Sequence, residues 1–299
     1  MAAAANLTNN AAITTAAREI DFVSQFSRDL SALREAWNLS NPIRKPAGAE
    51  IKGKTASVTL QSGAVAEGDT IPYSKATVAP VSLGTINLEK YRTGVTIEAI
   101  KDHGYANAVA ETEEAFRGEL RDEILDKFYN YLLTGSLTGT KATFQAAVAN
   151  AIGKAKAAFQ GLKKDANRVV VFVNTVDFYD YLGNQAITVQ NQFGMEYVTN
   201  FLGAAVMVLS DKVTSGKVIA TPAKNVVIYY VDPSDADFAD AGLVYTTDDE
   251  LPLVGFHTEG NYGTAVSDMF AIMGVVMAAE YINGIAVITV SASNASGQS

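Results

Sequence analysis

The stretch from residue 64 to residue 100 is polar, alternates only loosely between apolar and polar side chains, and leads into the longest amphipathic helix that the sequence predicts. A segment with so few apolar side chains cannot bury a core of its own. Ordering its backbone nevertheless costs roughly 1 to 2 kcal/mol per residue. We therefore expect this segment to be held against another subunit, and the feature indicates self-assembly rather than catalysis.

Residues 50–59 ahead of this stretch also alternate, with Ile51 and Val58 as their only strongly apolar side chains. Gly63 and Gly68 follow, so the pattern predicts a β-hairpin with both faces largely exposed to water. Strands that are polar on both faces fix their register weakly and are usually held by a partner. A second strand pair is predicted around Gly84 and extends to Ile97.

A long helix is predicted at residues 106–133 because apolar side chains recur there at steps of four residues. The stripe consists of Phe116, Leu120, Ile124, Phe128 and Leu132, widened by Val109, Leu125 and Tyr131. The opposite face is rich in carboxylates, which we interpret as a solvated surface. At ~1.5 Å per residue the helix is about 40 Å long, and Gly135 is predicted to end it.

Residues 1–48 are interpreted as an N-terminal arm with a single amphipathic helix. Apolar side chains that include Phe22, Phe26 and Trp37 recur at spacings of three and four residues. Pro42 and Pro46 follow and are expected to end the helical stretch.

Residues 142–260 have the pattern of an α/β unit. Val169–Val173 is a continuous apolar run typical of a buried strand. Asn174 or Thr175 is predicted to cap the short helix that follows. Helix 144–159 is predicted before this strand, further strands at 205–209, 226–231, 243–245 and 251–256, and more strand-like runs at 264–290.

Composition excludes several classes of protein. The net charge of −9 argues against a chain whose main task is to grip nucleic-acid phosphates. The absence of cysteine excludes disulfides and thiolate metal sites. The N-terminal residues have no signal-peptide pattern, and the most apolar window, 270–282, is too short to span a membrane.

No enzyme signature emerges from the motifs. The segment Gly135–Lys141 has the wrong glycine spacing for a phosphate-binding loop and is interpreted as a flexible link. His103 and His257 lack metal-ligand spacing, and the acidic residues between Asp232 and Glu259 miss the calcium-loop pattern. We expect no catalytic residue, no cofactor and no metal.

The order of these segments resembles that of a tailed-phage major capsid protein, whose fold is shared with encapsulins and herpesvirus capsid floors. The resemblance covers about residues 20 to 290 and is carried by the loop sequence Ala66–Pro72, by strands ending at Val95-Thr96-Ile97, by the helix ending Leu132–Gly135, and by Val171–Leu182 with Leu202–Val206. It implies an α+β fold with an N-terminal arm (1–48) and an extended loop (49–84). It further implies a peripheral domain (85–140 and 261–299) with a spine helix, and an α/β axial domain (141–260).

The resemblance implies a structural protein of the virion, assembled in the host cytoplasm. Its subunits form pentamers and hexamers in an icosahedral shell that encloses double-stranded DNA without sequence-specific binding. The expected partners are other copies of the chain, a portal protein, a scaffolding protein and a decoration protein, with no membrane. The assembly contacts are expected at Glu67, Gly68, Ile71, Pro72, Phe22, Phe26 and Trp37.

Two properties of some family members are also implied. The chain shows no long helical scaffolding segment ahead of the arm, so the scaffold is expected to be a separate protein or to have been removed. An isopeptide bond would join a loop lysine to an asparagine of a neighbour. The candidates are Lys52, Lys54 and Lys75, with Asn283, although lysines on an exposed hairpin are ordinary.

Two alternatives remain open. An encapsulin-type nanocompartment would have the same fold around a protein cargo instead of DNA. A soluble α/β enzyme or ligand-binding domain in residues 142–260 is the more distant alternative, weakened by the lack of a constellation of titratable residues.

Overall fold

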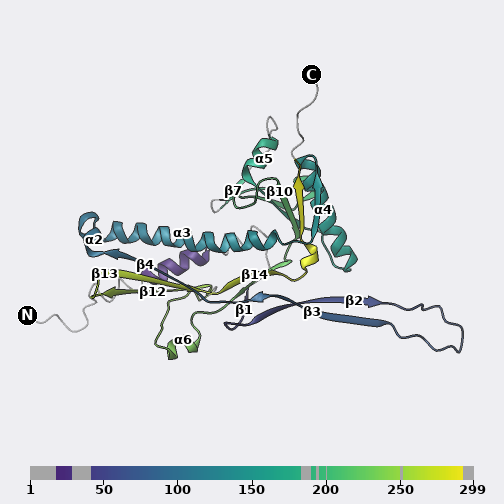
Figure 1. Cartoon of the computed structure of the whole chain (residues 1–299), viewed down its shortest axis with the longest axis horizontal. Helices are drawn as coiled ribbons and strands as arrows, with labels where there is room; N and C mark the ends of the chain where they lie inside the picture. The colour runs from purple at the N-terminus through teal and green to yellow at the C-terminus, as the bar shows by residue number, and fades with distance from the viewer. Residues whose placement is uncertain are drawn as a thin grey trace, which may run out of the picture.

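The computed structural model describes residues 18–28, 42–182, 190–192, 195–199, 201–249 and 252–291. A long helix lies along a flat sheet, an α/β unit stands at one end of this layer, and a β-hairpin projects beyond it (Figure 1). The hairpin therefore extends away from the body of the chain instead of folding back on it.

The layer below the long helix is an antiparallel sheet in the order β12-β13-β4. Its strands are β4 (Glu89–Thr96), β12 (Val254–Asn261) and β13 (Val266–Met273). The helix itself, α3 (Tyr105–Leu132), follows the short α2 (Ile97–His103), which confirms the predicted long helix. Gly104 joins the two helices at a φ of 83°, a left-handed conformation that favours glycine.

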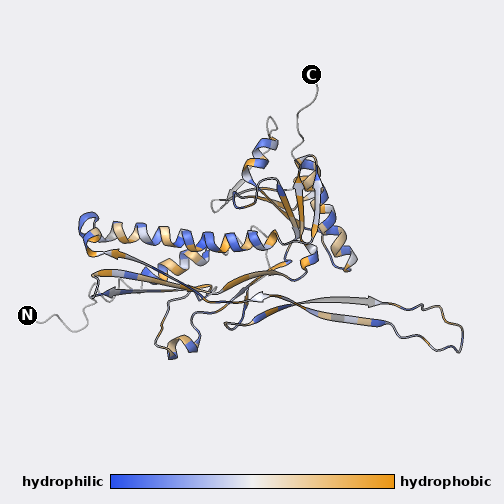
Figure 2. Ribbon diagram, viewed as in Figure 1, coloured by the Kyte–Doolittle hydropathy of each residue, from blue (hydrophilic) through white to orange (hydrophobic). Residues whose placement is uncertain are grey.

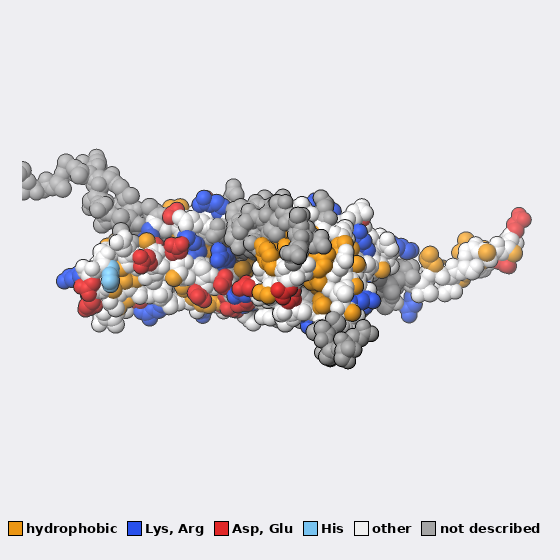
Figure 3. Space-filling model, turned by 90° about the horizontal axis from the view of Figure 1, so that it is seen from above, with side chains coloured by type: hydrophobic (Ala, Val, Ile, Leu, Met, Phe, Trp, Pro, Cys, Tyr) orange, Lys and Arg blue, Asp and Glu red, His pale blue; other side chains and the backbone are white. Residues whose placement is uncertain are grey.

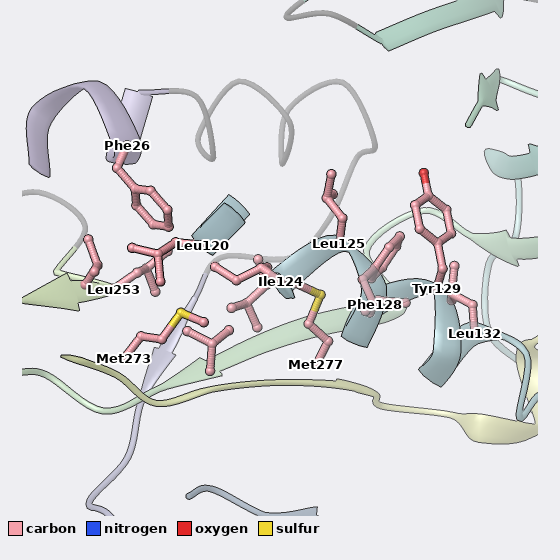
Figure 4. Packing of buried hydrophobic residues seen from close by; sticks show 14 of the residues in the cluster. Phe26, Leu120, Ile124, Leu125, Phe128, Tyr129, Leu132, Leu253, Met273 and Met277 are labelled. Carbon is pink, nitrogen blue, oxygen red and sulfur yellow. The ribbon is translucent and has the colours of Figure 1, made fainter. Parts of the chain in front are cut away.

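The predicted apolar stripe of α3 forms the main core. Leu120, Ile124, Phe128 and Leu132 are buried, whereas Phe116 is only partly buried at its edge. Figure 4 shows Leu120, Ile124 and Phe128 facing Met273 of β13 and Met277, which lies in the next strand along the chain. Hydrophobic and hydrophilic residues alternate along α3 in Figure 2, as an amphipathic helix requires.

The α/β unit is built on a seven-stranded sheet in the order β5-β15-β10-β6-β9-β8-β7. The strands are β5 (Leu137–Lys141), β6 (Val169–Val173), β7 (Gln190–Gln192), β8 (Met195–Thr199), β9 (Val206–Leu209), β10 (Lys217–Pro222) and β15 (Ala286–Val290). The helix α4 (Phe144–Gly161) and the short α5 (Thr175–Leu182) pack on it and share its second core. Asn174 caps α5 as predicted, because its side-chain oxygen accepts a hydrogen bond from the N–H of Val176 at 2.9 Å.

A small sheet in the order β1-β11-β14 connects these parts. It contains β1 (Ile43–Arg44), β11 (Val226–Tyr230) and β14 (Val275–Ala279). The projecting hairpin consists of β2 (Glu50–Thr59) and β3 (Lys75–Thr85). The remaining short helices are η1 (Phe201–Gly203), α6 (Ala236–Asp240) and η2 (Ile282–Gly284).

Several local predictions were wrong. The segment Gly135–Lys141 is no flexible link, because β5 pairs in parallel with β15. The strand pair around Gly84 does not form, because Gly84 lies inside β3 and β4 pairs with β13 instead. Ile97 starts α2, where Thr96 caps the helix by accepting a hydrogen bond from the N–H of Ala99 at 3.3 Å. Residues 243–245 form no strand, and only Thr246 bridges to Phe256.

One part of the expected division of the chain also differs from the sheet pairing. Residues 261–299 were expected to belong to a peripheral domain, yet β15 lies between β5 and β10 in the seven-stranded sheet. The apolar sequence of β15 would suit either the peripheral domain or the seven-stranded sheet, so only its long-range pairing shows which of the two it joins. Within the described residues, no helix combines the length and the apolar character that crossing a bilayer requires.

Candidate assembly surfaces

The tip of the hairpin, residues 60–74, is exposed along its whole length. Ile71 is 71% exposed and Tyr73 is 97% exposed, although both are large apolar or aromatic side chains. The predicted contact residues Glu67, Gly68 and Pro72 lie in the same exposed segment. The single chain therefore presents an apolar tip that none of the described residues covers.

The base of the hairpin is anchored, in contrast to its tip. Ile51 and Ile86 are buried together with Val231 and Ala278 in a separate small core. The pairing of β2 with β3 shifts between Ile51 and Lys52, where the hairpin leaves this core. Burial of one isoleucine side chain contributes roughly 1.5 to 3 kcal/mol, so the base is held firmly while the tip is free to meet another molecule.

The helix at residues 18–28 lies against the body of its own chain. Phe22 stacks on Phe256, with ring centroids 3.9 Å apart and an interplanar angle of 9°. Phe26 is buried in the same core. Both were predicted as contacts between subunits, but in the single chain they are interior residues. Trp37, predicted with them, lies outside the described residues.

Sequence reasoning missed Glu19, which fixes this helix to the sheet. Its carboxylate accepts hydrogen bonds from the backbone N–H of Thr258 at 2.7 Å, from the Thr258 hydroxyl at 2.8 Å and from the Thr246 hydroxyl at 2.7 Å. A buried carboxylate is tolerated when its oxygens are satisfied in this way. A lone glutamate in a polar arm carries no local signal of such a role.

No protein-family model matches this sequence, and no curated protein sequence is significantly similar to it. Solved structures are similar in fold. A capsid chain of bacteriophage PhiM1 matches at TM-score 0.55 and 9% identity, covering 85% of this chain and 86% of that one. A chain of the satellite phage P4 procapsid matches at 0.54 and 10%, covering 91% of each. A cyanophage A-1(L) capsid chain matches at 0.53 and 13%, covering 96% of this chain and 99% of that one.

This chain has the fold of bacteriophage capsid proteins. The α+β capsid fold predicted from the order of segments is thereby confirmed. From here on the hairpin β2–β3 is called the extended loop and α3 the spine helix, while the expected division into arm, loop and two domains stays a prediction.

The residues predicted to form an isopeptide bond are not brought together within one chain. Lys52 lies 3.0 Å from Glu50 on the extended loop, and Lys75 is exposed. The side chain of Lys54 lies outside what the structure describes. Asn283 lies in η2 beneath the α/β unit, where its side-chain oxygen accepts a hydrogen bond from the Ser136 hydroxyl at 3.2 Å. A bond between these residues requires two copies and stays a prediction.

Several charged side chains form ion pairs with other side chains of the same chain. Lys212, on the loop after β9, lies 3.0 Å from Asp126 of the spine helix. Arg44 of β1 forms ion pairs with Asp232 and Asp235, so the acidic stretch has a basic partner that its own sequence lacks. Among the described residues, no group of three potential metal ligands was found.

Proposed function

We propose that this chain is the major capsid protein of a tailed phage, which assembles as pentamers and hexamers into an icosahedral shell around double-stranded DNA. The observation that carries the proposal is the extended loop, anchored at Ile51 and Ile86 and exposed from residue 60 to residue 74. It is supported by a capsid fold that extends over nearly the whole chain. The role is structural, without catalysis.

A projecting loop that meets a different surface on the next copy makes a head-to-tail contact, and such contacts close into rings when the rotation permits. Each contact is modest, but a shell sums many of them. The net charge of −9 fits a wall that encloses DNA without gripping it. The partners proposed beyond the chain itself are a portal, a scaffolding protein and a decoration protein.

Negative-stain electron microscopy and sedimentation of the purified chain, alone and with the products of neighbouring genes, test this function. We expect closed particles of uniform size that protect DNA from nuclease when assembled in the infected cell. A chain that stays monomeric under all these conditions contradicts the proposal. Particles that contain a protein cargo and no DNA identify the encapsulin-type alternative instead.

A deletion of residues 60–74 replaced by a two-residue turn tests the extended loop itself. The subunit is expected to fold normally, because the deleted residues lie beyond the small core at the base, and to lose stable particles. The control replaces Lys90 and Lys101, which are exposed outside the loop, with alanine and should leave particle yield unchanged. Intact shells from the deletion variant would show that the loop does not hold subunits together.

A further inference from the structure

A hollow of about 260 Å³ lies at the base of the α/β unit, where the end of α4 meets η2 and the turn between β10 and β11. Aromatic rings of Phe159 and Tyr281 line it, together with the cations of Lys164 and Lys224.

The wall of the hollow is well ordered by specific contacts. Asn225 donates a side-chain hydrogen bond to the carbonyl of Tyr281 at 3.1 Å and accepts one from its N–H at 3.0 Å. The ring of Tyr281 meets that of Phe159 edge-on, with centroids 5.7 Å apart. The ammonium of Lys164 lies 4.8 Å from the centroid of the Tyr281 ring. This cation–π contact holds a positive charge beside an aromatic surface.

The backbone near the hollow adopts conformations that cost free energy. Lys224 has a φ of 63° and Lys163 a φ of 56°, both in the left-handed region that lysine rarely adopts. Such conformations persist where the surrounding structure imposes them, and they cluster at functional sites. The backbone at Lys224, and the backbone just ahead of Lys164, are thereby held in fixed conformations beside the hollow.

The charged side chains that line the hollow are those of Lys164 and Lys224, with Asp165 and Glu280. Asp165 is turned toward its own loop, because it accepts hydrogen bonds from the N–H of Asn167 at 3.0 Å and from its amide at 2.7 Å. The hollow is thus suited to a segment that combines apolar or aromatic side chains with carboxylates.

The tip of the extended loop has this combination of side chains. It exposes Ile71 and Tyr73 and carries Glu67 and Asp69, with no lysine or arginine between residues 60 and 74. Figure 3 shows acidic side chains at the far end of the projecting loop. The paired strands hold this tip away from the body by about 30 Å, at ~3.3 Å per residue, so it does not reach the hollow of its own chain (Figure 1).

We propose that the hollow receives the loop tip of a second copy, with Ile71 or Tyr73 against its aromatic rings and with Glu67 and Asp69 near Lys164 and Lys224. This inference rests on the proposed function, because it names the surface that the extended loop contacts. It makes the contact head-to-tail, since the tip and the hollow are different surfaces of one chain.

Cysteine crosslinking tests the contact directly, because the natural chain has no cysteine. Thr70→Cys in one copy and Asp165→Cys in another are expected to form an intermolecular disulfide when the two purified variants are mixed and oxidised. Disulfides require Cα atoms within about 7 Å. The control pairs Thr70→Cys with Thr264→Cys, an exposed residue of the turn between β12 and β13. Equal yields from both pairs, or none from the first, would overturn the proposal.

Charge exchange tests the same contact in assembled particles. Lys164→Glu with Lys224→Glu is expected to lower particle yield at least tenfold, and adding Glu67→Lys with Asp69→Lys should restore it. Lys90→Glu with Lys101→Glu, exposed elsewhere, is the matched control, and thermal unfolding checks that every variant is folded. Unchanged yield, or loss without restoration, contradicts the proposal.

Normal particles that protect less DNA would show that the hollow binds phosphates instead. If the unaltered chain forms no particle, the proposed function fails, and the disulfide yield still decides whether tip and hollow meet.

Discussion

The carboxylate of Glu19 accepts two hydrogen bonds from Thr258, one from the backbone N–H and one from the hydroxyl. Because Glu19 belongs to the arm and Thr258 to β12, this pair ties the beginning of the described chain to a strand 239 residues away. A third bond to Thr246 brings in the segment that bridges to Phe256.

Glu19→Ala is expected to lower the free energy of unfolding by roughly 1 to 3 kcal/mol, because it leaves buried donors of Thr258 without an acceptor. Glu19→Gln keeps one acceptor oxygen and should lose less. Urea unfolding followed by circular dichroism measures both. Glu111→Ala, on the exposed face of α3, is the control, and an equal loss there would refute the role of Glu19.

Ile86→Ala at the loop base should lower the free energy of unfolding by about 2 to 5 kcal/mol, since it leaves a cavity in the small core. Ile71→Ala at the tip should change it by less than about 0.5 kcal/mol, because that side chain is exposed in the single chain. The same unfolding experiment on unassembled subunits separates the two. A large loss for Ile71→Ala would mean that the tip packs within its own subunit.

The pair Arg92 and Asp268 links β4 to β13 and predicts a dependence of stability on pH. Hydrogen bonds from Arg92, at 2.6 and 3.2 Å, hold the pKa of the Asp268 carboxyl below its ordinary value. Since the folded-state pKa is lower than the unfolded one, folding favours the ionised form. The stabilisation is therefore present above the unfolded pKa and is lost as the pH falls through the folded pKa.

The dependence of stability on pH is tested by melting temperatures of the unaltered chain and of Asp268→Asn, measured between about pH 3 and pH 7. The two curves should converge at the acidic end and separate toward neutral pH. Asp102→Asn, at an exposed position in α2, should follow the unaltered chain throughout. A constant gap between the unaltered chain and Asp268→Asn would contradict the prediction.

Two glycines near the spine helix should respond oppositely to alanine. Gly118 lies within α3 with open space around it, so Gly118→Ala should stabilise the subunit by about 0.5 to 1 kcal/mol. A Cβ at Gly135 would lie 2.6 Å from Cγ2 and 2.8 Å from the carbonyl oxygen of Ile285. Gly135→Ala should therefore cost about 1 to 3 kcal/mol. Differential scanning calorimetry measures both, and a stabilising Gly135→Ala would disprove the close approach.

Elements with a strong periodic pattern were predictable from the sequence. The stripe from Leu120 to Leu132 fixed the face of α3, and the apolar run at Val169–Val173 gave β6. Gly135 was predicted as a helix stop, but the structure shows that a close approach to Ile285 is what requires glycine there.

Features that depend on distant pairing were not predictable. β5 reads as a polar link because its sequence, LTGTK, is ordered only by β15 about 150 residues later. The hollow draws its lining from segments around Phe159, Lys224 and Tyr281, none of which has a local motif. The role of Glu19 depends on Thr258, a residue 239 positions away that no local pattern links to it.

The position of β15 between β5 and β10 has a consequence for biosynthesis. A nascent chain that has emerged only as far as residue 285 lacks β15, so it can neither complete the seven-stranded sheet nor attach β5 to it. By then the extended loop would already be synthesised. Tyr281, which forms one wall of the hollow, would not yet be followed by the strand β15. Ribosome-bound chains would thus be poor acceptors for neighbouring loops, which delays association until translation has passed this strand.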